Sequence, residues 1–361
     1  MSEEPLEAGF AILWARRAYW LDSIDNRDPN SNKMERATKK LKDSLIFAKY
    51  VLASPGMINI LREVTKMNPR YQPGNPLPTV LVFGGPGSGK EKIARLIPLF
   101  SDDYFDSDVT VVNLAALRPE TAVVPLLTGL SLESNWGELS VRGILQKAKE
   151  RDPSTKKGNL PVLILDELNS LDLESQGVLL RIIENGELQA LGSPSSETVE
   201  FLIIGIINES PEELTQELVM ANVSRARHLF GEIANALIGS ILLRAKRLRP
   251  DLYYRLRRGG EITLPSLNAR REDIPILFYH FLTAEFSELQ PDMAAKISVD
   301  LGVFDFLLSR EIDWSGNVRQ LQMFAKKCCK HILSRHGGLL GEPRVRRSDT
   351  ETVAKNSGLL V

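Results

Sequence analysis

Short apolar runs alternate with stretches of helical periodicity through the middle of the chain, from residue 79 to about residue 264. Runs of this kind, bounded by turn residues, are typical of strands, and the periodic stretches between them are typical of helices. Near-continuous apolar strands indicate a parallel sheet that helices cover on both faces, so the predicted fold class is α/β. The five expected strands are Thr79–Phe83, Val109–Leu114, Val162–Leu165, Phe201–Ile207 and Glu261–Leu264.

Helical patterns flank this region on both sides. Residues 7–50 have apolar positions at helical spacing with a polar break at 25–32, and the pattern predicts a further helix that starts at Pro55. The stretch 271–336 is expected to be all helix, and the chain after it to be mobile. The predicted division is a helical N-terminal segment 1–50, an α/β core 51–270, a helical subdomain 271–338 and a flexible tail 339–361.

Composition narrows the class of protein without changing this picture. Hydrophobic residues make up 43% of the chain, charged residues 25%, and the formal net charge is -1, which fits a soluble globular protein and provides no global basic field for nucleic acid. No apolar run reaches the ~18 residues that span a bilayer, and the acidic N-terminus lacks a signal-peptide pattern. The adjacent cysteines Cys328 and Cys329 suit neither a disulfide framework nor a metal cage. We therefore expect a cytoplasmic protein with no membrane partner.

A glycine-rich segment follows the first predicted strand directly and precedes a predicted helix. It consists of Gly84, Gly85, Pro86, Gly87, Ser88, Gly89 and Lys90. In this setting glycines allow backbone N–H groups to close on phosphate oxygens, and the lysine reaches the outer phosphates of a nucleotide. The alternative is an ordinary glycine-rich turn between a strand and a helix. The next residue is Glu91, where most such loops carry a Ser or Thr for Mg²⁺, so metal binding has to depend on another residue.

Two adjacent acids end the third predicted strand. Asp166 is the candidate ligand for Mg²⁺, directly or through water, and Glu167 is the candidate general base that polarises the attacking water. The alternative is that these acids cap the next helix. Their position after an apolar strand, in the same alternating pattern as the glycine-rich loop, favours nucleotide hydrolysis.

Taken together, these motifs resemble the central AAA+ domain of bacterial enhancer-binding proteins, the activators of sigma-54 RNA polymerase. The family's phosphate loop reads Gly-Glu-Ser-Gly-Thr-Gly-Lys-Glu, and Glu91 matches its unusual last residue. The resemblance extends from about Ser54 to His336. Other similar stretches are Ser54–Met57, Val112–Leu117, Arg249–Leu256, Arg270–Pro275 and Trp314–Leu321.

The resemblance implies roles for five more residues. Asn113 would restrain the catalytic glutamate, Asn208 would be the sensor I residue, and Arg319 would be sensor II, which contacts phosphate from the lid helix. Arg249 and Arg255 would project toward the ATP of a neighbouring subunit, where a guanidinium stabilises charge on the transferring phosphoryl group. From the residues alone, the asparagines could instead be polar strand ends or turn residues, and the arginines could lie in surface ion pairs.

The resemblance also implies an architecture and an assembly. The family is an AAA+ P-loop NTPase with a parallel five-stranded sheet in the order 5-1-4-3-2 and a helical lid subdomain. It binds ATP with Mg²⁺, and its active sites lie between the subunits of a homo-oligomeric ring, which we expect to be a hexamer here.

Three departures from the family restrain the functional interpretation. The Gly-Ala-Phe-Thr-Gly-Ala loop that contacts sigma-54 is replaced by the stretch Thr128–Gly137, which offers Trp136 instead. An extra stretch near 215–247 carries several arginines, which could bind nucleic acid or an acidic partner, although a solvated or intersubunit helix face is favoured. The chain after His336 is expected to be too short for a helix-turn-helix domain, so specific DNA binding within this chain is not expected.

The favoured interpretation is a ring-forming AAA+ ATPase that couples ATP hydrolysis to the remodelling of a protein client, which the Trp136 loop would contact. Trp136 could instead pack on the sheet. One alternative is a sigma-54-dependent transcription activator with a divergent contact loop; sigma-54 polymerase is the less favoured partner. A second alternative is an assembly scaffold that binds ATP and hydrolyses little of it, although Glu167, Arg249 and Arg255 favour turnover.

Overall fold

Two compact units make up the part of the chain that the structure describes. The computed structural model describes residues 54–67, 69–100, 103–104, 109–116, 128–134, 137–141, 143, 160–190, 192–208, 248–289, 297–336 and 343–360. The sheet unit comprises Arg62–Gly84 and Lys90–Thr263, and the helical unit comprises the residues up to Leu61, Gly85–Gly89 and the residues from Leu264 on. The predicted helices in 1–50, the stretch 215–247 and Trp136 lie outside the described residues.

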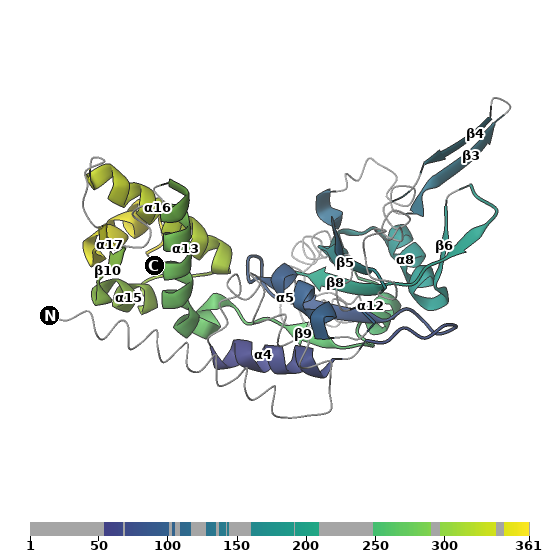
Figure 1. The fold of residues 1–361 in the computed structure, drawn as a ribbon, viewed down its shortest axis with the longest axis horizontal. Coiled ribbons are helices and arrows are strands. Elements are labelled where there is room, and N and C mark those ends of the chain that lie inside the picture. The colour runs from purple at the N-terminus through teal and green to yellow at the C-terminus, as the bar shows by residue number, and fades with distance from the viewer. Residues whose placement is uncertain are drawn as a thin grey trace, which may run out of the picture. The chain divides into compact units, whose positions relative to one another are not determined.

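A five-stranded parallel sheet forms the centre of the sheet unit (Figure 1). Its strands are β1 (Thr79–Phe83), β2 (Val109–Asn113), β5 (Val162–Asp166), β8 (Leu202–Ile207) and β9 (Glu261–Thr263). Their spatial order is β2-β5-β8-β1-β9, which confirms the expected order 5-1-4-3-2 when it is read from β9. The apolar runs form strands because β1, β5 and β8 are the inner strands, and the sheet buries them almost completely.

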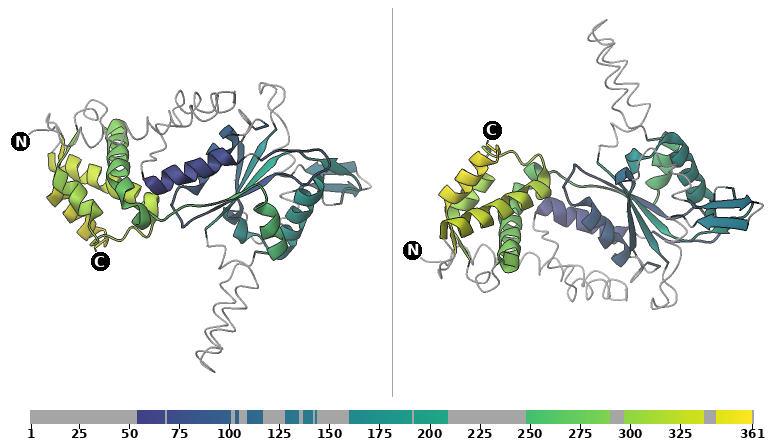
Figure 2. Two further views of the ribbon diagram at one scale, coloured as in Figure 1. Left: turned by 90° about the horizontal axis from the view of Figure 1, so that it is seen from below. Right: turned by 90° about the horizontal axis from the view of Figure 1, so that it is seen from above.

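Helices cover both faces of this sheet. Figure 2 shows α8 (Leu173–Asn185) and α12 (Pro250–Leu256) on one face and α5 (Lys90–Leu96) on the other. Helix α8 begins after Asp172, whose carboxylate accepts a hydrogen bond from Ser175 N at 2.7 Å, and it ends at Gly186, whose φ is 64°. Short 3-10 turns lie at Ile97–Phe100, Leu114–Ala116 and Leu168–Ser170.

Two β-hairpins in the sheet unit are not part of the five-stranded sheet. One pairs β3 (Leu130–Ser134) with β4 (Gly137–Val141), and the other pairs β6 (Glu187–Gln189) with β7 (Ser196–Thr198). The sequence pattern predicted neither hairpin. The first overlaps the stretch Thr128–Gly137, which replaces the family's sigma-54 contact loop.

The helical unit packs its own hydrophobic core. Its elements after the 3-10 segment Leu267–Asp273 are α13 (Ile274–Leu289), β10 (Ser298–Val299), α15 (Leu301–Leu308), α16 (Asn317–His336), β11 (Arg344–Val345) and α17 (Arg347–Asn356). Trp314 is fully buried at its centre and donates its indole N–H to Leu307 O at 3.3 Å. Cys328 and Cys329 are free and buried on α16, and burial raises the pKa of the Cys329 thiol to about 11.

A helix with one apolar face lies at the start of the described residues. Helix α4 (Pro55–Lys66) begins at the proline, as expected, and its apolar residues Met57, Ile60, Leu61 and Val64 are buried. Within the described residues, no helix combines the length and the apolar character that a membrane span requires.

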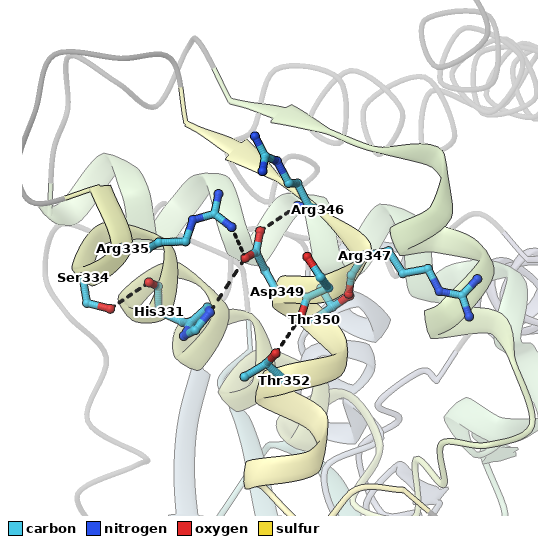
Figure 3. Close-up of polar contacts among 9 residues, drawn as sticks. His331, Ser334, Arg335, Arg346, Arg347, Asp349, Thr350 and Thr352 are labelled. Carbon is cyan, nitrogen blue, oxygen red and sulfur yellow. Dashed lines mark hydrogen bonds and ion pairs between the residues drawn. The ribbon is translucent and has the colours of Figure 1, made fainter.

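The prediction of a flexible tail is wrong for residues 343–360. Helix α17 packs against α16, with Val353 and Ala354 in the core of the helical unit, and Leu360 bridges to Ile312. The buried Asp349 holds the start of α17, because its carboxylate pairs with Arg335 on α16 and accepts a hydrogen bond from Arg346 N at 2.9 Å (Figure 3). The sequence of α17 is mostly polar, so its stability comes from these tertiary contacts rather than from an apolar stripe.

Asp349→Asn should loosen this end of the helical unit. The substitution leaves Arg335 without its buried partner, and we expect a loss of about 2 kcal/mol in the free energy of unfolding. Thermal denaturation measures the loss, and limited proteolysis should cut the variant near α17 first. Glu351→Gln is the matched control, because Glu351 pairs with Arg347 on the exposed side of the same helix and should matter little. An Asp349→Asn variant as stable as the parent would contradict this account.

Candidate functional site

The carboxyl ends of four parallel strands meet at one edge of the sheet. Gly84 follows β1, Asn208 follows β8, Asp166 ends β5 and Asn113 ends β2. Because β1, β8, β5 and β2 are neighbours and run in the same direction, these residues lie along a single edge. Asn113 and Asp166 are direct partners in the register of β2 and β5. The parallel sheet therefore brings together predicted site residues that are far apart in sequence, as open α/β sheets do where they bind ligands.

Lys90 and Asp166 give this edge its charge. Lys90 is the first residue of α5 and is 6% exposed, and its Nζ donates a hydrogen bond to Gly84 O at 2.6 Å. Burial raises the pKa of the Asp166 carboxyl, and the positive charge of Lys90 and a hydrogen bond from Glu167 N–H offset only part of that rise. A cation at Asp166 would favour its ionised form, which is the form that binds Mg²⁺.

Glu167 has an unusual backbone conformation. Its φ is 56° and its ψ is 45°, in the left-handed region that few residues other than glycine adopt. Its N–H donates to Asp166 Oδ1 at 3.0 Å, and its carbonyl accepts from Ser170 N at 2.8 Å. These two bonds support the strained turn between the two adjacent acids. Strain of this kind concentrates at functional sites.

The two asparagines have different surroundings. Asn113 is exposed, and its Oδ1 accepts a hydrogen bond from Ala116 N at 3.1 Å, so in this structure it closes the turn that follows β2. Asn208 is half-buried directly after β8. Their roles as switch and as sensor I stay predictions.

The phosphate loop has the backbone that its glycines predict. Gly87 has φ 73° and Gly89 has φ 100°, values that a residue with a Cβ rarely adopts. Ser88 N donates to Gly85 O at 3.2 Å and closes the turn. The hydroxyl of Ser88 is buried and has no hydrogen-bond partner among the described residues, so a phosphate oxygen fits the chemistry of the loop.

A divalent cation fits this site only with oxygen ligands from outside the protein. Among the described residues there is no group of three or more His, Cys, Asp or Glu side chains arranged to hold a metal ion. Mg²⁺ typically takes one or two carboxylates together with substrate phosphates and water. Asp166 is the carboxylate that suits this use. Glu91, which replaces the usual Ser or Thr, pairs instead with Arg95 on the exposed side of α5 at 2.9 Å.

Arg249 and Arg255 lie at the two ends of α12. Arg249 precedes the helix, and its guanidinium pairs with Asp251 at 2.7 Å, while Arg255 pairs with Glu184 on α8 at 2.8 Å. Both ion pairs are partly exposed and are therefore weak. The alternative that the sequence left open, that these arginines lie in surface ion pairs, is what this structure shows. Because the pairs are weak, either guanidinium could leave its partner at a small cost in free energy.

In the helical unit, Arg319 is exposed in the first turn of α16. A Cβ added to Gly87 would lie 3.0 Å from Arg319 Cβ and 2.6 Å from Gly316 O, so the phosphate loop and the start of α16 touch. Two further residues contact the loop from this unit, Arg270 and Asn317. Sequence analysis noted both as parts of family-like stretches and gave them no role, because only tertiary contacts show what they touch.

Comparisons with known proteins agree with this geometry. A family model for the sigma-54 interaction domain matches residues 51–223, and a model for the AAA+ ATPase lid domain matches residues 268–336. Regulatory protein AtoC of Escherichia coli (strain K12) is 28% identical over 319 residues, which are 88% of this chain and 57% of AtoC. Transcriptional activator RocR of Bacillus subtilis (strain 168) is 30% identical over 246 residues, which are 68% of this chain and 43% of RocR. The chain thus spans about half the length of the curated relatives that it matches.

Solved structures show the same fold. The structure of NtrX from Brucella abortus in complex with ADP has a TM-score of 0.57 at 20% identity, and covers 88% of this chain and 57% of NtrX. The complex of the same protein with ATP has a TM-score of 0.55 at 21% identity, with 86% of this chain and 59% of NtrX covered. With the sheet order, the phosphate loop and the two family models in agreement, the chain belongs to the AAA+ ATPase family in which a sigma-54 interaction domain is followed by an AAA+ lid domain.

Proposed function

We propose that this chain binds ATP with Mg²⁺, hydrolyses it within a homo-oligomeric ring, and uses the energy to remodel a protein partner in the cytoplasm. The observation that carries the proposal is the carboxyl edge of the sheet. Asp166 ends β5 there, Glu167 follows it directly, and Lys90 donates a hydrogen bond to Gly84 O, just after β1. A cation, a metal-binding carboxylate and a second carboxylate are the groups that phosphoryl transfer to water requires.

The roles follow from the chemistry of each group. Backbone N–H groups of Gly84–Gly89 and the ammonium of Lys90 hold the outer phosphates, and Asp166 holds the metal ion. Bound Mg²⁺ supplies positive charge to the phosphate oxygens. Glu167 accepts a proton from the attacking water, and the hydrogen bond from its N–H to Asp166 Oδ1 supports its left-handed backbone. Arg319 and Asn208 would sense the outer phosphate, and Asn113 would restrain Glu167.

Substitutions at Lys90 and Glu167 should separate binding from turnover. Lys90→Ala should weaken nucleotide binding at least about tenfold, because a charge-assisted phosphate contact disappears. Glu167→Gln should keep the affinity and lose about 100-fold or more in turnover, because the amide cannot accept the proton. Fluorescent nucleotide titration and phosphate release measure the two effects.

The matched controls are Lys92→Ala on α5 and Glu174→Gln on α8, which are exposed residues of the same types. Normal turnover by Glu167→Gln would overturn the site assignment. A parent chain that binds ATP and releases no phosphate at any protein concentration would support the scaffold alternative instead.

Arg249 and Arg255 should act on the ATP of a neighbouring subunit. Specific ATPase activity should therefore rise with protein concentration as rings form. Arg255→Ala mixed with Glu167→Gln should recover part of the activity, since the two lesions lie on opposite sides of a shared site. Arg257→Ala is the control, because Arg257 extends from the end of the same helix α12 and pairs with Glu261. Constant activity per protomer down to a proven monomer would exclude arginines that act in trans.

The β3–β4 hairpin is the segment that we propose contacts the client. Ser134 pairs with Gly137 in the hairpin register, so Asn135 and Trp136 connect the two strands. Tryptophan is a frequent interface anchor because it buries a large area at low entropic cost. The second candidate function, sigma-54 activation, is favoured by the family model, which includes this hairpin within residues 51–223.

A purified transcription assay should discriminate the two functions. We expect the chain not to open sigma-54 promoter complexes, because the hairpin lacks the family's contact motif. Trp136→Ala should leave basal ATPase unchanged and abolish client-stimulated turnover, whereas Asn135→Ala should affect the stimulation far less. ATP-dependent open-complex formation by the parent would establish the sigma-54 function.

A further inference from the structure

Three consecutive carbonyl groups of the phosphate loop accept hydrogen bonds from other segments of the helical unit, to which Gly85–Gly89 belong. All three donors come from outside the loop, two from the start of α16 and one from the 3-10 segment before α13. They are Asn317 Nδ2 to Pro86 O at 3.0 Å, Val318 N to Gly87 O at 3.0 Å, and Arg270 Nη2 to Ser88 O at 2.7 Å.

These three bonds determine where the loop directs its N–H groups. In a trans peptide the carbonyl of one residue and the N–H of the next point in opposite directions. Holding the carbonyls of Pro86 and Ser88 toward the helical unit therefore turns the N–H groups of Gly87 and Gly89 to the other side. Convergent backbone N–H groups are what a phosphate loop offers its ligand. The three donors thus support the anion-binding side of the loop through its carbonyl groups.

Asn317 is fixed so that its amide can act in this way. It is 3% exposed, and its φ of 56° is a left-handed value that asparagine tolerates better than most residues. Its Oδ1 accepts from Leu267 N at 2.7 Å, and its Nδ2 donates to Pro86 O and to Ser315 O. Both ends of the amide are used, so the orientation of the side chain follows from its contacts.

Arg270 is held by a second buried network. It is 4% exposed, and its Nη1 lies 3.7 Å from a carboxylate oxygen of Asp273. That carboxylate accepts hydrogen bonds from Ser54 N at 2.6 Å and from Ser54 Oγ at 2.9 Å. The charge of Arg270 is therefore paired inside the helical unit, and its planar fork can donate to Asp273 and to the loop at the same time.

We propose that Asn317 and Arg270 are positioning residues for nucleotide binding. They hold the phosphate loop by its carbonyl groups, and they thereby couple the affinity for a nucleoside di- or triphosphate to the folding of the lid, the part of the helical unit that contains them. The proposal rests on the proposed function. By linkage, a bound nucleotide stabilises the lid by the same free energy with which the lid improves binding.

Asn317→Asp is the sharpest variant. The aspartate keeps the size, the tolerance of positive φ and the acceptor for Leu267 N, and it replaces the donor to Pro86 O with an oxygen. We expect affinity for ADP to fall about tenfold or more, because the carbonyl of Pro86 loses its donor and meets a negative oxygen. The matched control is Asn268→Asp in the same unit. Asn268 also accepts backbone and side-chain hydrogen bonds and donates one, to Asp313 at 2.6 Å, but does not contact the loop.

Arg270→Lys is a second variant, which keeps the charge and loses the fork. Its control is Arg271→Lys, because Arg271 donates to Ser309 O and Ile312 O and has no bond to the loop. The Kd for ADP is measured by titration of the full chain with a fluorescent analogue, and thermal denaturation with and without ADP reports the stability of each variant. A residue with a structural role alone would lower the midpoint of the nucleotide-free chain and leave the Kd unchanged. A positioning residue raises the Kd and reduces the stabilisation by ADP.

The outcomes separate this inference from the proposed function. A higher Kd for Asn317→Asp and Arg270→Lys, with both control variants within about twofold of the parent, supports the inference. Unchanged Kd values for the two variants, with a parent that binds ADP, would overturn the inference and leave the proposed function intact. A parent chain that binds neither ADP nor ATP would overturn both.

Discussion

Parallel pairing of strands is the constraint on which the site depends. Because β1, β8, β5 and β2 run in one direction, their carboxyl ends meet at one edge, and whatever residue follows each strand is delivered there. Asn113 and Asp166 are register partners although about fifty positions separate them in the sequence. An antiparallel partner would place these two side chains at opposite edges. The chemistry of the edge is therefore a consequence of the order and direction of the strands, and the buried apolar runs of β1, β5 and β8 hold that order.

The parts that sequence predicted well are those that local pattern determines. Buried strands are apolar on both faces, so their limits could be read closely, and the family resemblance supplied their spatial order. The phosphate loop was identified because its glycines are required locally by positive φ values at Gly87 and Gly89. Sequence placed Arg270 and Asn317 in family-like stretches but predicted no role for them, because their partners Ser88 and Pro86 are distant in sequence.

The sequence pattern did not predict the structured tail or the hairpins, because local pattern does not determine them. Helix α17 has few apolar residues, and its place is decided by Asp349, Arg335 and two small buried side chains that come together only in the folded unit. A composition-based interpretation assigns such a segment to a mobile tail. The β6–β7 hairpin is made of strands of three residues, which are too short to show alternation. The general limit is that a segment stabilised by distant partners carries little of its own signal.

The link between Thr79 and α12 has a consequence for how neighbouring sites would communicate. Thr79 Oγ1, at the amino end of β1, donates to Arg255 O at 2.7 Å, and the carboxyl end of the same strand leads into the phosphate loop. One buried strand of five residues, β1, therefore joins the backbone of Arg255, which we propose acts on a neighbour's nucleotide, with the loop that we propose holds the subunit's own nucleotide. Strand β1 is hydrogen-bonded to β8 on one side and to β9 on the other, and this pairing limits bending of β1 between these two points. In the proposed ring, a movement of the phosphate loop in one subunit would then reach Arg255 of that subunit through β1, and so reach the ATP site of the next subunit.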